Sequence, residues 1–92
     1  MISNMISLWV MGIAIDLEKL TNSKSVRFTV AIKIAEKYFG KPRITGSHHI
    51  FKMPWQGDPR INMQSGKGSS AKPYQIKILV KALKKLEELS NE

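Results

Sequence analysis

A change in the spacing of apolar residues is the feature that most constrains the fold of this chain. From Phe28 to Phe39 the apolar residues recur every three or four positions, which predicts an amphipathic helix with Thr29 as its N-cap residue. Gly40 and Pro42 end that pattern at the positions expected for a helix C-terminus. Because short alternating segments follow, the chain is expected to adopt an α+β fold.

Three short strands are predicted beyond the helix. Residues 43–45 and 48–53 are expected to pair across a turn at 46–47, which consists of Gly and Ser. Residues 54–59 are rich in turn formers, and residues 60–64 alternate polar and apolar side chains as a half-buried strand does. Strands joined by such short connections are expected to be antiparallel.

A second amphipathic helix is predicted from Pro73 to the end of the chain, because proline is well tolerated in the first turn of a helix. Its apolar stripe comprises Ile76, Leu79, Val80, Leu83 and Leu86. Its lysines, Lys77, Lys81, Lys84 and Lys85, form either a solvated face or a phosphate-binding one. The expected architecture is an α-β-β-β-α order, in which both helices cover one face of a three-stranded antiparallel sheet and the other face is open.

Residues 1–15 are apolar but lack the basic start of a secretory signal, and they fall short of the roughly 20 apolar residues that span a bilayer. They are interpreted as a dispensable extension, an added strand or a packing arm. Asp16 to Leu20 is expected to form a short helical turn. The predicted organisation is an N-terminal extension, 1–15, followed by one domain, 16–92, with no membrane role.

Charge narrows the choice of partner. The 92 residues hold 15 Lys and Arg against 7 Asp and Glu, a formal net charge of +8 with an isoelectric point near 10.0. Such a balance favours nucleic acid first and an acidic protein second. The absence of cysteine excludes disulfides, thiolate zinc sites and a cysteine nucleophile, and it agrees with a cytoplasmic location.

The two histidines of the chain, His48 and His49, are adjacent at the start of the second predicted strand. Histidine is the side chain whose unperturbed pKa lies nearest neutrality, so the pair suggests proton transfer on a polyanion. His49 shares strand parity with the apolar Phe51 and Met53, which turns His48 toward solvent. A bulge at residues 46–47 would exchange the two, so His49 stays open as the alternative.

Four segments carry a resemblance to a known family: Gly46-Ser47-His48-His49-Ile50-Phe51, Val26-Arg27-Phe28, Arg60-Ile61-Asn62-Met63-Gln64 and Ala71-Lys72-Pro73-Tyr74-Gln75-Ile76. In their order along the chain they resemble the HicA toxins of bacterial type II toxin–antitoxin systems, from about Asp16 onward. The resemblance implies a fold like that of double-stranded-RNA-binding domains. It also implies a ribonuclease that cleaves mRNA, inhibits translation and is neutralised by a HicB-type antitoxin protein.

By position, the resemblance implies that His48 is the functional histidine, with His49 as the alternative. Metal-free RNA cleavage needs a base for a ribose 2′-hydroxyl and cations that stabilise charge on the phosphate. No cofactor or metal is expected, and the candidate RNA-contacting residues are Arg43, Ser47, Lys52, Arg60, Lys72 and Lys77. Trp55 and Tyr74 either stack on RNA bases or pack against the protein. The competing interpretations are a non-catalytic RNA-binding module and a basic protein that docks an acidic partner.

Overall fold

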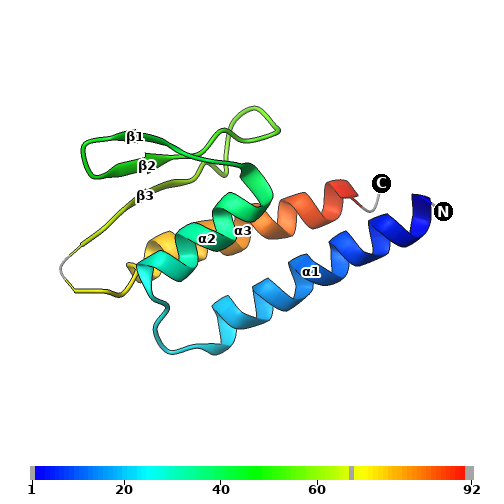
Figure 1. Cartoon of the computed structure of the whole chain (residues 1–92), viewed down its shortest axis with the longest axis horizontal. Helices are drawn as coiled ribbons and strands as arrows, with labels where there is room; N and C mark the ends of the chain where they lie inside the picture. The colour runs from blue at the N-terminus through cyan, green and yellow to red at the C-terminus, as the bar shows by residue number, and fades with distance from the viewer. Residues whose placement is uncertain (1, 67, 91–92) are drawn as a thin grey trace.

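The computed structural model describes residues 2–66 and 68–90, with side chains described from residue 9 onward. Its elements are, in order, α1 (Ile2–Asn22), α2 (Phe28–Phe39), β1 (Arg43–Thr45), β2 (His48–Ile50), β3 (Asn62–Gln64) and α3 (Pro73–Ser90). Figure 1 shows the sheet on one side of α2 and α3, while α1 runs alongside α3. No helix in the described part of the chain is long and apolar enough to cross a membrane.

The α+β class and the antiparallel sheet are as predicted. The strand order is β1-β2-β3, and α2 and α3 flank the strands in the chain order typical of double-stranded-RNA-binding domains, with α1 added before them. The strands are shorter than expected. β2 ends at Ile50, and the pairing continues by a single hydrogen bond of 3.0 Å from the Phe51 amide to the Ile61 carbonyl.

One apolar core joins all three helices to the inner side of the sheet. Leu79 and Leu83 of the predicted α3 stripe are fully buried, and the other stripe residues are half-buried against them. The sheet contributes Met63, and the segments next to the strands contribute Phe51 and Ile61. The expectation that the helices cover one face of the sheet is therefore confirmed.

The N-terminal segment differs most from expectation. It is neither a strand nor a separate extension, because α1 is continuous across residues 15 and 16, and the short turn expected at 16–20 is its last part. Ile13 is fully buried in the core. A Cβ atom on Gly12 would lie 3.3 Å from the Tyr38 hydroxyl, so α1 approaches α2 closely. These contacts agree with the packing-arm interpretation.

The start of α2 also differs from the prediction, which placed an N-cap at Thr29. The helix begins at Phe28, after an extended Arg27 whose side chain makes no capping hydrogen bond in the described structure. The Phe28 amide donates instead to the Ser69 carbonyl at 2.7 Å, and Arg27 forms a β-bridge with Ser70. A distant segment thus satisfies a free amide that a side-chain cap would otherwise satisfy.

Candidate active site

The register of the sheet separates the two histidines. Residues directly opposite each other in paired strands share a face. The register therefore defines an open face, directed away from the helices, that comprises Arg43, Thr45, His48, Ile50, Asn62 and Gln64. The inner face carries Ile44, His49 and Met63. The parity prediction for His48 and His49 is confirmed, because the turn between β1 and β2 introduces no bulge.

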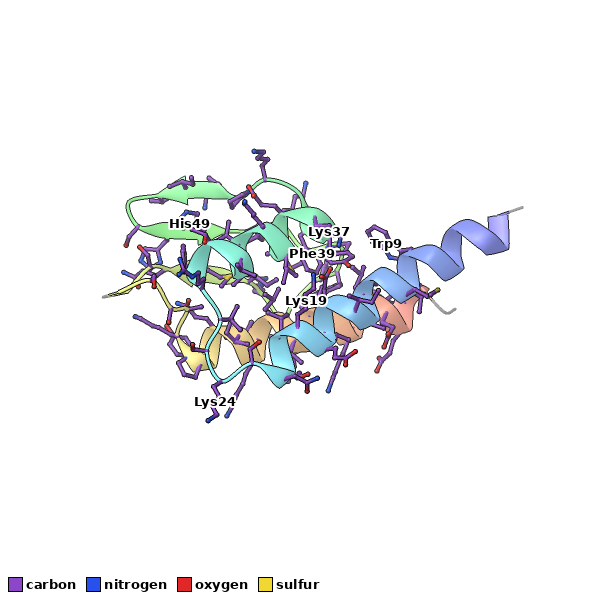
Figure 2. The ribbon with its side chains drawn as sticks, turned by 60° about the horizontal axis from the view of Figure 1, so that its bottom comes forward. Trp9, Lys19, Lys24, Lys37, Phe39 and His49 are labelled. Atoms are coloured by element: carbon purple, nitrogen blue, oxygen red, sulfur yellow. The ribbon has the colours of Figure 1, made fainter. Side chains whose placement is uncertain are left out.

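His49 is a packing residue. Its ring meets the Phe28 ring edge to face, with 5.4 Å between the centroids and 69° between the planes. Figure 2 shows its position on the side of β2 that faces α2. Its Nδ1 atom is buried and has no hydrogen-bond partner among the described residues. The ring is thus held away from the open face.

His48 lies on the open face and is oriented by one neighbour. Its Nδ1 atom is 3.1 Å from Oδ1 of Asn62, on the adjacent strand. In the tautomer that carries its hydrogen on Nδ1, the ring donates to this amide oxygen, and Nε2 is free to accept a proton. The pair therefore orients the ring in a way that suits a general base.

Ser47 stands beside His48 at the turn. Gly46 has a φ of 60°, a left-handed conformation that glycine adopts without steric cost and that the tight turn requires. Gln64 of β3 donates from Nε2 to the Ser47 hydroxyl at 3.0 Å, which ties the turn to the far strand. Of the candidate RNA-contacting residues, Ser47 is therefore held next to His48.

Three of the predicted cations lie on or beside the open face. Arg43 is exposed in β1, while Lys52 and Arg60 are exposed just beyond β2 and just before β3. None of the three forms an ion pair with Asp or Glu in the part of the chain that the structure describes. Lys52 and Arg60 also line a hollow of about 490 Å³, which we call the strand-end hollow. All three cations are available for a phosphate.

The remaining two predicted cations lie elsewhere. Lys72 is half-buried before α3, and its Cε atom would lie 3.1 Å from a Cβ atom on Gly66. Lys77 lines a separate hollow with Lys24, to which no strand contributes a residue. Lys77 therefore lies away from the histidine face, because the face of α3 that carries it is turned toward the end of α1.

Asn62 is a site residue that the sequence reasoning missed. The pattern contains a signal for it, because Asn62 and Gln64 are polar residues on one face of a predicted strand. That signal does not reveal the partner of His48, since the register of β2 against β3 places Gln64 directly opposite His48 and Asn62 diagonally from it. The aromatic Trp55, by contrast, was noted, and it both lines the strand-end hollow and packs edge to face on Phe39, 5.8 Å between centroids.

A second polar cluster joins α1 to α2. The carboxylate of the buried Asp16 accepts hydrogen bonds from the Tyr38 hydroxyl at 2.5 Å and from Lys37 Nζ at 2.9 Å. Burial raises the pKa of Asp16, but these hydrogen bonds and the charges of Lys37 and Lys19 outweigh that effect and lower it below its ordinary value. Burial and the bond to Asp16 raise the pKa of Tyr38. The cluster is structural, since it lies away from the open face.

Comparisons of the chain with protein-family models, with curated proteins and with solved structures returned no match. Within the described residues there is no group of three or more His, Cys, Asp or Glu side chains that could hold a metal ion.

Proposed function

We propose that this protein is an RNA-cleaving toxin of the HicA type, a metal-independent endoribonuclease that cleaves mRNA in the cytoplasm and so inhibits translation. One observation carries the proposal: the His48 imidazole lies on the open face with Nδ1 held by Asn62. Nε2 is then available to accept a proton, in a protein with a net charge of +8. The four segments that resemble HicA toxins support the same function.

The proposed chemistry is a transfer of the phosphate to the neighbouring ribose oxygen. Nε2 of His48 takes the proton of a 2′-hydroxyl as that oxygen bonds to phosphorus. The bond from phosphorus to the 5′ oxygen breaks, and the departing oxygen takes a proton from water. The products are a 2′,3′-cyclic phosphate and a 5′-hydroxyl. A well-placed general base contributes about 10²- to 10⁴-fold to such a reaction.

Cations assist by stabilising the charge that grows on the phosphate oxygens in the transition state. Arg43 shares the open face with His48, Lys52 lies just after β2, and Arg60 lies just before β3. Arginine presents paired donors that suit phosphate oxygens, whereas lysine acts as a compact charge. A base on one residue with cations on others suits this chain better than two histidines acting as a pair, because His49 faces the interior.

The proposed protein partner is a HicB-type antitoxin. A basic toxin is neutralised most simply by an acidic protein that covers its open face, because charge complementarity speeds association and steers orientation. This assignment depends on the resemblance to HicA toxins and on the charge of +8. The expected partner is a protein encoded by a neighbouring gene that binds the chain and stops its RNA cleavage.

The test is to replace each histidine separately. His48→Ala is expected to lower the rate of RNA cleavage by about 10²- to 10⁴-fold while the protein stays folded, because it removes the base. His49→Phe is the matched control, since it keeps a flat ring against Phe28 and removes a buried nitrogen that has no partner among the described residues. That variant is expected to cleave normally.

Cleavage is followed on a single-stranded RNA in buffer with a chelator, and the fold is checked by circular dichroism. A His48→Ala variant that cleaves as fast as the parent chain would contradict the proposal. RNA binding without cleavage by the parent chain would instead favour a non-catalytic RNA-binding module.

A further inference from the structure

We propose that the strand-end hollow is a subsite for one unpaired nucleotide of the RNA, adjacent to the phosphate at which cleavage occurs. The hollow lies where β2 and β3 end, and its lining includes Ile50, Lys52, Trp55, Arg60 and Asn62. Its volume of about 490 Å³ falls within the range of roughly 300–1,000 Å³ typical of small-molecule pockets. The inference rests on the proposed function, because that function brings RNA to His48.

The hollow is continuous with the histidine site. Asn62 lines the hollow, and the same side chain holds Nδ1 of His48 at 3.1 Å. Ile50 also lines the hollow. It lies two residues after His48 in β2 and on the same open face. At the rise of about 3.3 Å per strand residue, these two positions are about 7 Å apart. An RNA strand that crosses the open face therefore reaches the hollow within about one nucleotide of His48.

The wall of the hollow is fixed by contacts. Trp55 donates from Nε1 to the Pro59 carbonyl at 2.8 Å, which closes the loop on itself. Lys85 of α3 places Nζ 4.9 Å from the centre of the Trp55 ring and donates to the Asp58 carbonyl at 3.2 Å. Phe39 of α2 meets the edge of the same ring. A cavity formed by such an anchored loop is preformed, so a ligand does not have to order it.

The charge of the hollow suits a phosphate. Lys52, just after β2, and Arg60, just before β3, both line the hollow. Neither forms an ion pair with an acidic side chain among the described residues. No Asp or Glu side chain lines it within the described chain. Apolar surface between the two cations is provided by Ile50, Met53 and Trp55. Cations around an apolar, partly aromatic floor are the combination that binds single-stranded nucleic acid.

The shape of the hollow selects an unpaired base. Bases in an RNA duplex are stacked and their faces are covered, so a concave apolar site next to a strand end cannot receive one. An unstacked base can enter such a site while its phosphate stays at the rim. The substrate class that follows is RNA that is single-stranded at the cleaved position, in contrast to a duplex read by its shape.

Trp55 fluorescence provides a direct test. The chain has two tryptophans, so Trp9→Phe leaves Trp55 as the only reporter. The probe is a 2′-O-methyl oligoribonucleotide, which has no free 2′-hydroxyl and cannot be cleaved by this route. Single-stranded probe is expected to change the Trp55 emission in a saturable way, whereas the same sequence in a full duplex is expected to bind more weakly and leave the emission unchanged.

Substitutions locate the binding. Lys52→Ala and Arg60→Ala are each expected to weaken binding of the single strand by about tenfold, the loss of one hydrogen bond to a charged group. They are also expected to raise KM for cleavable RNA and to lower kcat far less than His48→Ala does, because the base remains in place. Lys81→Ala, an exposed lysine of α3 that does not line the hollow, is the matched control and is expected to bind normally.

Two results would overturn the subsite. The first is single-strand binding in both variants as tight as in the parent chain, and the second is equal emission changes with single strand and duplex. If His48-dependent cleavage persists in either case, the proposed function stands without this subsite. If the single strand fills the hollow but the parent chain does not cleave RNA, the nuclease assignment fails and the nucleotide site remains.

Discussion

Two adjacent histidines take different roles because a strand alternates its faces. His49 lies against Phe28 on the inner face, and His48 lies on the open face beside Asn62. The imidazole of His49 therefore packs against the interior, whereas the imidazole of His48 lies on the open face. The two rings also have different neighbours, since Asn62 on the adjacent strand contacts Nδ1 of His48 and orients that ring.

Asn62 is expected to be a positioning residue whose effect appears in the pH dependence of cleavage. In Asn62→Asp a carboxylate replaces the amide beside His48, and a negative charge favours the protonated ring. The base is then active only at higher pH. The acidic limb of the plot of cleavage rate against pH is expected to move to higher pH, measured with single-stranded RNA.

The same substitution at a distant exposed position is the control. Asn22→Asp lies at the end of α1, where the native side chain bonds Glu18, and it is expected to leave the pH profile where it is. An acidic limb that stays in place in Asn62→Asp would show that residue 62 does not contact the base.

At the scale of elements, α1 is part of the folded unit. It contributes Ile13 to the core and packs along α3. Its Trp9 ring meets Tyr38 edge to face at 5.1 Å between centroids, and its Asp16 accepts hydrogen bonds from α2. Figure 2 shows Trp9 and Lys37 on the side where α1 and α2 meet. α1 thus packs against both α2 and α3, the two helices that cover the sheet.

Ile13→Ala is expected to lower the free energy of unfolding by about 2–5 kcal/mol, because it removes a fully buried aliphatic side chain and leaves a cavity. Ile15→Ala, on the same helix but 53% exposed, is expected to change it by less than about 0.5 kcal/mol. Urea denaturation of both variants measures the difference. Equal effects of the two substitutions would show that α1 does not pack as described.

Asp16 is expected to make stability depend on pH in the acid range. Its pKa in the folded protein lies below the ordinary value of 3.8, so the unfolded chain binds the proton more tightly. The stability that its charge contributes is complete above pH 3.8 and is lost as the pH falls through the lower folded value. Asp16→Asn is expected to reduce the free energy of unfolding at pH 7 and to flatten its decline in acid.

The control for this prediction is Glu18→Gln, an exposed carboxylate on the same helix. It is expected to change stability little at either pH, as measured by urea denaturation at pH 7 and pH 3. An Asp16→Asn variant that matches the parent chain at both pH values would refute the role of the cluster.

At the scale of the whole molecule, the sequence predicted the features of the fold that depend on the spacing of apolar residues. The α-β-β-β-α order, the turn at 46–47 and the opposite orientations of the histidines all follow from periods of 3.6 and 2. α1 was not predicted as one long helix because its first 15 residues carry no charged side chain, so no charged face reveals the helical period. The start of α2 depends on Ser69, a contact that no local pattern contains.

The candidate site was predicted only in part, because strand alternation shows which residues share a face but not which residues meet across two strands. Strand parity places His48, and the cations next to the strands, Arg43, Lys52 and Arg60, stay near it. The position of Lys77 relative to the sheet was not predicted, because helical periodicity shows which residues share a face but not which neighbour that face meets. The link between His48 and Asn62 requires the register of two strands joined by a long loop, and it becomes visible only in three dimensions.

The most direct test of the account is the chemistry of the RNA ends. Purified protein is incubated with single-stranded RNA in a chelator, and the new termini are identified by mass spectrometry. Proton removal from the 2′-hydroxyl by His48 predicts 2′,3′-cyclic phosphate and 5′-hydroxyl ends, with no cleavage of 2′-O-methyl RNA. Products with 5′-phosphate ends, or intact RNA after incubation with folded protein, would contradict it.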